Sequence, residues 1–371
     1  MRSVGRIAAM FGLAIYTFVV CEFAVRVLKP QPLMPRYITG TAWGVRGNIP
    51  NAKYWHSTAE VRVEYRINAQ GMRADRAISL SKPVGTCRVA MFGDSFFMGY
   101  ELDLRDTVAS QIETMLEENG YKAEVLNFSV SGFGTAEMLR TYDAYARGFS
   151  PDAVIFQWHS SDLDDNVRAG LYKIRNDRAI ATGSSYLPSV AIQDVLMKLS
   201  PYRWLSDNSH LYSWLREKVA VLVKKMLVVR SDAKAVGDER ASRPRPRNGR
   251  GREAKVVPHS VVLAAELLRL ANESVIADGR SFLVVDIPKS RGRTAFESDW
   301  DRLPHSSVEE VEVLHAAEVF RPFAGPDTKL YYEEGHHHLT PLAARALASA
   351  VATRLIDRGS MTGCESKLPP T

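Results

Sequence analysis

The stretch of the chain best suited to chemistry is Gly93-Asp94-Ser95, which ends an apolar run at Val89–Phe92. The apolar run is typical of a buried strand, and a helix is expected at about 107–118. A serine on a strand-to-helix turn lies near a helix N-terminus, where free backbone N–H groups stabilise a negatively charged oxygen. This position suits a nucleophilic hydroxyl, although an ordinary turn with a helix-capping serine has the same local pattern.

Two further loops follow predicted strands in the same way. A strand is predicted at 123–128 and is followed by Gly132, and another at 153–158 is followed by Ser161. Because these strands alternate with helical segments, the sheet is expected to be parallel, with helices on both faces. Ligands of such sheets bind beyond the carboxyl ends of the strands. Ser95 is therefore expected to meet the other two loops at one edge of the sheet.

These segments resemble the sequence blocks of the SGNH (GDSL-like) hydrolase family. Residues 89–99 match the first block, 129–135 match the second, and 159–166 match the third in part, with Ser161 where the family has an asparagine. The resemblance implies an α/β protein with a three-layer α/β/α sandwich of flavodoxin-like type. It also implies an oxyanion hole made by the backbone N–H groups of Ser95 and Gly132 and the hydroxyl of Ser161.

The last block of the family has a catalytic histidine just before the final helix. Here His338-Leu339-Thr340-Pro341 precedes a helix expected at about 341–358. The resemblance therefore assigns His338 as the base that takes the proton of Ser95. The acid of the family, two or three residues earlier, would fall on a residue that is not acidic. Glu334 is instead predicted to orient the imidazole.

The triplet His336-His337-His338 leaves other arrangements open. Glu333 is an alternative acid, Glu334 could pair with His337, and a Ser–His dyad would remain if no acid reached the base. Adjacent histidines also fit a metal site, but neighbouring residues of an extended chain point to opposite sides and no third ligand is evident. No metal and no cofactor are therefore expected, and solvated loop histidines remain the plain alternative.

The chain divides into three parts. Residues 59–371 are expected to form the α/β domain, with an insertion at about 167–256 that interrupts the strand–helix alternation. The insertion includes an amphipathic helix at about 210–229 and an arginine-rich stretch at 238–253, whose composition is typical of disorder. It is a candidate lid or substrate-binding wall. Residues 29–58 are expected to be a linker or a surface wrap.

The N-terminus is the second informative region. Two arginines precede the uncharged stretch Ile7–Cys21, and apolar residues continue beyond it. Residues 1–28 are expected to be an uncleaved, single-pass anchor in the inner membrane, crossing at 6–28, with the catalytic domain outside the cytoplasm because the basic end stays inside. The segment at 65–73 resembles one found in membrane-anchored bacterial members of the family. A cleaved signal peptide, a lipoprotein Cys21 and a buried helix of a soluble protein are the alternatives.

Composition narrows the function classes. The formal net charge of +6 comes largely from the arginine-rich stretch, which has neither interleaved aromatic residues nor a nucleic-acid motif, so no nucleic-acid partner is expected. Three cysteines are too few and too scattered for a disulfide framework or a zinc site. Cys87 and Cys364 could pair only if the fold brought them together.

The resemblance implies ester hydrolysis or acyl transfer through a covalent acyl-enzyme. An anchored domain facing the periplasm would meet cell-envelope glycans. The expected substrate is therefore an O-acyl group, most simply O-acetyl, on an extracellular polysaccharide or peptidoglycan. An O-acyltransferase of polysaccharide synthesis and a non-catalytic glycan-binding protein are the alternatives. The oligomeric state is left open.

Overall fold

The centre of the molecule is a parallel sheet. The computed structural model describes residues 2–33, 35–242, 257–334 and 336–365, and within them five strands pair in the order β13-β10-β7-β5-β6. Their bounds are β5 (Cys87–Phe92), β6 (Ala123–Asn127), β7 (Ala153–Trp158), β10 (Ser281–Asp286) and β13 (Val313–His315). All four pairings are parallel. Counted along the chain, this is the doubly wound strand order 2-1-3-4-5, so the predicted flavodoxin-like sheet is confirmed.

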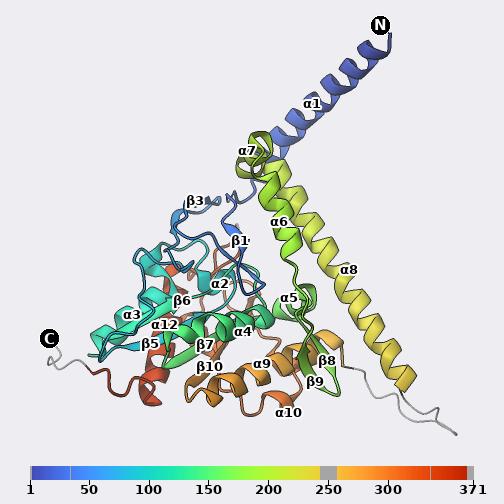
Figure 1. Ribbon diagram of the computed structural model, residues 1–371. Coiled ribbons are helices and arrows are strands. Elements are labelled where there is room, and N and C mark those ends of the chain that lie inside the picture. Colours follow the sequence, from blue (N-terminus) through green and yellow to red (C-terminus); the bar gives the residue numbers. More distant parts are fainter. Residues whose placement is uncertain (1, 34, 243–256, 335, 366–371) are drawn as a thin grey trace.

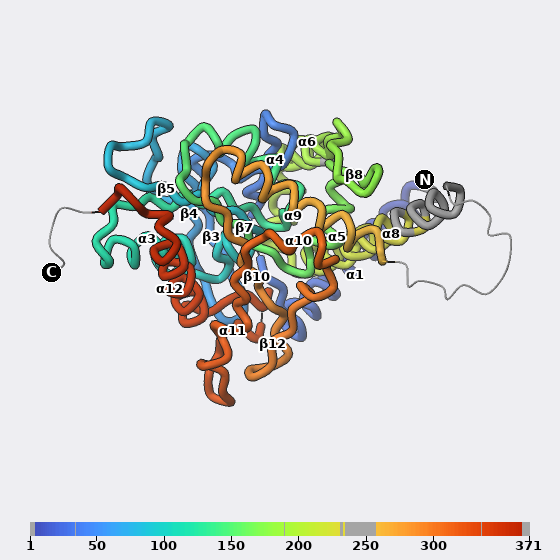
Figure 2. Tube along the Cα trace, turned by 90° about the horizontal axis from the view of Figure 1, so that it is seen from below, coloured from blue at the N-terminus to red at the C-terminus, as the bar shows by residue number. Residues whose placement is uncertain are grey.

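Helices cover both faces of the sheet, as predicted (Figure 2). On β5, Val89 and Met91 enter one apolar cluster with α3 (Val108–Glu118) and α12 (Pro341–Asp357). Ala90 and Phe92 point to the other face and enter a second cluster, with α4 (Thr135–Ala144) and α9 (His259–Ala277). Alternation of side chains along a strand explains this division. Burial on both faces explains why β5 and β7 read as continuous apolar runs.

The remaining elements surround this core. The N-terminal segment forms two hairpins, and the insertion forms a third hairpin and three helices. Their bounds are β1 (Ile38–Gly40), β2 (Arg46–Asn48), β3 (Lys53–Ser57), β4 (Arg62–Arg66), α2 (Ser95–Met98), α5 (Asp162–Ala169), β8 (Tyr172–Arg175), β9 (Arg178–Ala181), α6 (Leu187–Leu196), α7 (Ser200–Asn208), α8 (His210–Ser242), β11 (Lys289–Ser290), β12 (Phe296–Glu297), α10 (His305–Val308) and α11 (Ala316–Phe320). Short 3₁₀ helices lie at Leu104–Asp106, Ala146–Phe149, Trp300–Arg302 and Arg321–Phe323.

The two segments outside the α/β core pack on it. In the N-terminal segment, Trp43 stacks on Tyr145, the residue that follows α4, with ring centroids 4.4 Å apart, so this segment packs on the domain surface. The helix predicted at 210–229 belongs to the longer helix α8. The arginine-rich stretch was predicted to be disordered, and most of it, residues 243–253, lies outside the described residues.

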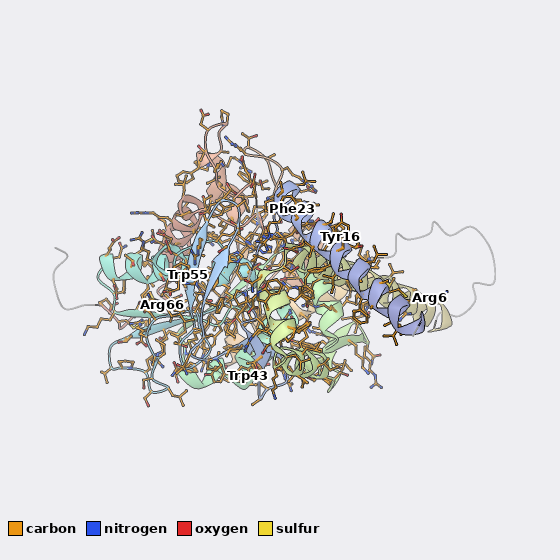
Figure 3. The ribbon with its side chains drawn as sticks, turned by 90° about the horizontal axis from the view of Figure 1, so that it is seen from above. Arg6, Tyr16, Phe23, Trp43, Trp55 and Arg66 are labelled. Carbon is orange, nitrogen blue, oxygen red and sulfur yellow. A yellow bond between two sulfur atoms is a disulfide. The ribbon has the colours of Figure 1, made fainter. Side chains whose placement is uncertain are left out.

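Helix α1 (Arg2–Leu28) extends away from the rest of the molecule (Figure 1). It is long and apolar enough to cross a membrane, with a mean hydropathy of 2.0 and none of the span buried. Arg6, Tyr16 and Phe23 lie at successive positions along it (Figure 3). Near its end, the Glu22 carboxylate accepts hydrogen bonds from Ser209 Oγ, at 2.7 Å, and from two backbone N–H groups at the start of α8. A carboxylate at a helix N-terminus is favourable because it meets the positive end of the helix dipole.

A disulfide joins the two ends of the α/β domain. Cys87, the first residue of β5, is bonded to Cys364 near the C-terminus, 277 residues later, whereas Cys21 is free and exposed. The fold thus brings together the two cysteines whose pairing the sequence left open.

Replacing Cys87 and Cys364 by serine should lower the free energy of unfolding by ~2–5 kcal/mol, because the bond closes a long loop in the unfolded chain. Urea unfolding of the two forms measures the difference. Thiol titration of the denatured, unreduced wild-type chain should find only Cys21, and reduction should expose all three cysteines. Three reactive thiols before reduction would show that the bond is absent.

Candidate active site

Ser95 is held on a tight turn between β5 and α2. Asp94 caps α2, with its carboxylate accepting the N–H of Phe96 at 2.9 Å and the Nε2–H of Gln157 at 2.7 Å. Gln157 also accepts the N–H of Phe97 at 3.2 Å. A Cβ on Gly93 would lie 2.5 Å from Gln157, so only glycine fits this turn. The turn therefore presents the Ser95 hydroxyl in a fixed place beyond the end of the strand.

His338 lies against Ser95. Its Nε2 is 2.7 Å from Ser95 Oγ. The backbone carbonyl of His338 accepts the N–H of Tyr332 at 2.8 Å, and Thr340 caps α12 immediately after it. These contacts fix the loop that directly precedes α12. They hold the imidazole of His338 against Ser95, although the two residues are 243 positions apart in the sequence.

The carboxylate beside His338 belongs to Glu101, and the prediction of Glu334 is corrected. Glu101 Oε2 lies 3.3 Å from His338 Nδ1 and also accepts the backbone N–H of His338 at 3.3 Å. Its other oxygen accepts the backbone N–H of His336 at 3.0 Å. Burial would raise the pKa of Glu101, but the hydrogen bonds and charge of His338 and His336 lower it. Glu101 is therefore held as a carboxylate that can orient the imidazole.

The two acids near the histidine triplet have other partners. Glu334 is exposed, and its backbone N–H donates to Glu60 Oε2 at 2.8 Å. Glu333 forms ion pairs with Arg293 and Lys329. Sequence reasoning searched close to His338, whereas Glu101 is 237 residues away along the chain. The signal that could have found it is an acidic residue inside the apolar stretch that follows the Ser95 turn.

The other two histidines of the triplet have separate environments. The His336 ring stacks on His56 at 5.5 Å, and desolvation by these packed neighbours, with the nearby charge of His338, lowers its pKa. His337 has a φ of 57° and its Nδ1 lies 3.2 Å from the Tyr332 carbonyl. Within the described ranges, no group of three His, Cys, Asp or Glu side chains is placed to hold a metal ion.

The hydroxyl of Ser161 is already engaged, which corrects its predicted place in an oxyanion hole. Ser161 Oγ lies 2.8 Å from His159 Nδ1, and the Ser161 N–H donates to the same nitrogen at 3.2 Å. Since Nδ1 accepts, the proton of the neutral ring is on Nε2. Burial lowers the pKa of His159 to about 3, so the ring stays neutral. Its Nε2–H has no acceptor among the residues described, and His159 lines the cavity that contains Ser95.

Gly132 lies beside Ser95 with a φ of 70°, a conformation that favours glycine. Its carbonyl accepts hydrogen bonds from Arg46 of the N-terminal segment and, at 2.6 Å, from Arg168 of α5. Both arginines form ion pairs with the fully buried Glu137. The backbone N–H groups of Ser95 and Gly132 have no acceptor among the described residues, so both can donate to a ligand.

A cavity of about 710 Å³ opens over these groups, and we call it the loop-side cavity. Its walls combine cations and aromatic rings from the loops after β10 and β13 with residues of the three predicted loops: Ser95, Phe96, Gly132, His159, Ser161, Lys289, Arg293, Phe296, Lys329, Tyr331, Tyr332 and His338. Ser95, Gly132 and Ser161 therefore line one cavity at the carboxyl edge of the sheet. A hydroxyl, an imidazole and a carboxylate in sequence, beside free N–H groups, are the parts needed for nucleophilic attack on an acyl carbon.

No protein-family model matches the chain, and no curated protein matches it. Solved structures with a similar fold include a member of the lipolytic protein G-D-S-L family from Veillonella parvula, 10% identical with a TM-score of 0.36, covering 73% of this chain and 99% of that chain. Another is the acetyl xylan esterase AlAXEase, 11% identical with a TM-score of 0.37 over 72% and 99% of the two chains. The SGNH-hydrolase family esterase AlinE4 is 16% identical, with a TM-score of 0.34 over 74% and 96%.

Glu101→Gln should lower kcat on an aryl acetate by roughly 10⁴-fold, because the amide no longer stabilises the charged imidazole or fixes its tautomer. Glu334→Gln is the matched control and should keep wild-type kcat, since that side chain is exposed. Steady-state kinetics with p-nitrophenyl acetate measures both. If Glu334→Gln lowers kcat and Glu101→Gln does not, the carboxylate that orients His338 is Glu334.

His159→Leu should lower kcat by roughly 10²–10³-fold if its Nε2–H faces the developing oxyanion. His159→Gln places an amide N–H near the same position and should recover part of the loss. Because burial keeps His159 neutral, neither change should move the acid limb of the pH–rate profile. A Leu variant as active as the Gln variant would exclude this hydrogen bond from the reaction.

Proposed function

We propose that this protein is a serine esterase that removes O-acyl groups from a cell-envelope or extracellular glycan. The observation that carries the proposal is the contact of 2.7 Å between Ser95 Oγ and His338 Nε2, with Glu101 on the opposite side of the imidazole. This contact joins a nucleophile to a base within hydrogen-bond reach, and the base is oriented in turn by a carboxylate.

The reaction would proceed in two halves. Ser95 Oγ attacks the ester carbonyl while His338 Nε2 takes its proton, and the tetrahedral oxyanion accepts the N–H groups of Ser95 and Gly132 and the Nε2–H of His159. Collapse of the intermediate breaks the bond to the alcohol oxygen, which receives the proton from His338. In the second half, His338 takes a proton from the water that attacks the acyl-enzyme. The bond between the acyl carbon and Ser95 Oγ then breaks, His338 returns the proton to Ser95 Oγ, and the carboxylic acid leaves.

Three features support an envelope substrate. The Cys87–Cys364 disulfide favours an oxidising compartment, and α1 is suited to hold the domain at the outer face of the membrane. The loop-side cavity also has aromatic side chains, among them Phe296 and Tyr332, whose apolar faces suit packing against sugar rings. Its three cations are paired with acidic side chains of the protein: Lys289 with Asp299, Arg293 with Glu333, and Lys329 with Glu60. The alcohol part of the ester is accordingly assigned to the loop-side cavity.

Ser95→Ala and His338→Gln should each reduce hydrolysis of p-nitrophenyl acetate to background, because either change removes the activated nucleophile. His337→Gln is the matched control from the same loop and should keep most of the activity. A fluorophosphonate probe should label wild-type Ser95, as read by peptide mass spectrometry, and should fail to label Ser95→Ala. A folded Ser95→Ala variant that retains hydrolysis would overturn the proposal.

A further inference from the structure

Ser95 lies where two cavities meet. Besides the loop-side cavity, a cavity of about 800 Å³ is lined by Ser95, Gly132 and His338. We call it the anchor-side cavity, because most of its other walls come from the chain that follows α1 and from the insertion helices α6, α7 and α8. An ester has two substituents on its reacting carbonyl, the acyl chain and the alcohol. A nucleophile between two cavities can therefore place one substituent in each.

The insertion helices give the anchor-side cavity an apolar wall. Ala220, Val223 and Leu227 of α8 line it at positions i, i+3 and i+7, which lie along one face of a helix. Val190 of α6 and Met197, the residue after it, line it as well. Val223 is 48% exposed and Leu227 is 37% exposed. Apolar surface beside a nucleophile is left in contact with water unless an apolar ligand covers it.

Most of the charge in this cavity is already compensated. Arg36 pairs with Asp194 at 2.7 Å, and Arg46 and Arg168 pair with Glu137. Two tyrosines of the wall, Tyr202 and Tyr212, bond to each other through their hydroxyls at 2.7 Å. Arg216, whose guanidinium lies over the Tyr212 ring at 5.7 Å, and Glu217 are the further charged residues of the wall. The apolar residues of α6 and α8 form the rest of the surface that faces a ligand on this side.

The anchor-side cavity also lies next to the end of the candidate membrane helix. Gln31 and Pro32, which line it, follow α1 by only a few residues. Figure 1 shows α7 beside the end of α1, and Trp204 of α7 is 59% exposed. Tryptophan is enriched at membrane–water interfaces. This end of the cavity is thus the part of the site nearest to lipid.

We propose that the anchor-side cavity binds the acyl chain of the substrate, and that this chain is a fatty acyl group of medium or greater length rather than acetyl. The ester is one of a membrane-associated glycolipid, with its polar alcohol in the loop-side cavity. This proposal rests on the proposed esterase function and names its acyl group. A volume of about 800 Å³ far exceeds the space that an acetyl methyl group needs.

The first test uses the full-length chain in lipid nanodiscs and p-nitrophenyl esters of acetate, butyrate and octanoate. Burial of each added methylene should raise kcat/KM by roughly two- to fourfold, so octanoate should be hydrolysed best. Highest kcat/KM for acetate, with a fall at octanoate, would overturn the assignment of the acyl chain and leave the esterase proposal intact. Hydrolysis of none of the three esters would instead overturn the esterase proposal.

The second test narrows the cavity. Val223→Trp and, as a smaller change, Ala220→Leu should each lower the ratio of kcat/KM for octanoate to kcat/KM for acetate. The tryptophan should lower this ratio by at least roughly tenfold, because several methylenes of the octanoyl chain would no longer be buried. Val221→Trp is the matched control, because Val221 is a 44% exposed residue of the same helix that does not line the cavity. Acetate hydrolysis reports that each variant is folded. An equal ratio in Val223→Trp and Val221→Trp would overturn the proposal.

Discussion

The site depends on one buried carboxylate. Glu101 is 1% exposed, and its two oxygens accept the backbone N–H groups of His336 and His338 and contact the His338 imidazole. A buried charge is tolerated when such donors satisfy it. Because Glu101 follows the Ser95 turn and the histidines precede α12, these bonds join two segments from opposite ends of the domain. The alignment of His338 on Ser95 is a direct consequence.

The second constraint lies on the other side of Ser95, at Gly132. Its carbonyl accepts hydrogen bonds from Arg46 of the N-terminal segment and Arg168 of α5. Glu137 of α4 forms an ion pair with each of these two arginines. Guanidinium groups that are paired and hydrogen-bonded in this way fix a loop more firmly than van der Waals contacts do. The N-terminal segment is therefore part of the support of the site, although its composition suggested only a linker or a wrap.

Local patterns in the sequence predicted the sheet, the helices on its faces and the place of Ser95 beyond a strand, because each depends on neighbouring residues. Gly132 and His338 were assigned from short motifs that resemble those of the SGNH family, and such motifs are also local. Glu101 and the Cys87–Cys364 pair could not be predicted in this way, since both depend on contacts between distant segments. Ser161 shows a different limit. Its position beyond β7 was predicted, but its partner was not, because the hydrogen bond to His159 depends on the tautomer and direction of a nearby ring.

Two sets of contacts made by helix α8 and the residue before it place the insertion relative to the site. At one end, Glu22 of α1 accepts hydrogen bonds from Ser209 and from the first N–H groups of α8. Further along α8, Lys224 pairs with Asp165 of α5, with Nζ and Oδ1 3.1 Å apart. The same helix thus binds both the candidate anchor and the core beside Gly132. With α1 in a membrane, these contacts would fix the orientation of the site to the lipid surface. In that orientation an acyl chain reaches Ser95 along the apolar wall of α8, from the side of the site that lies nearest to α1, without crossing the loop-side cavity.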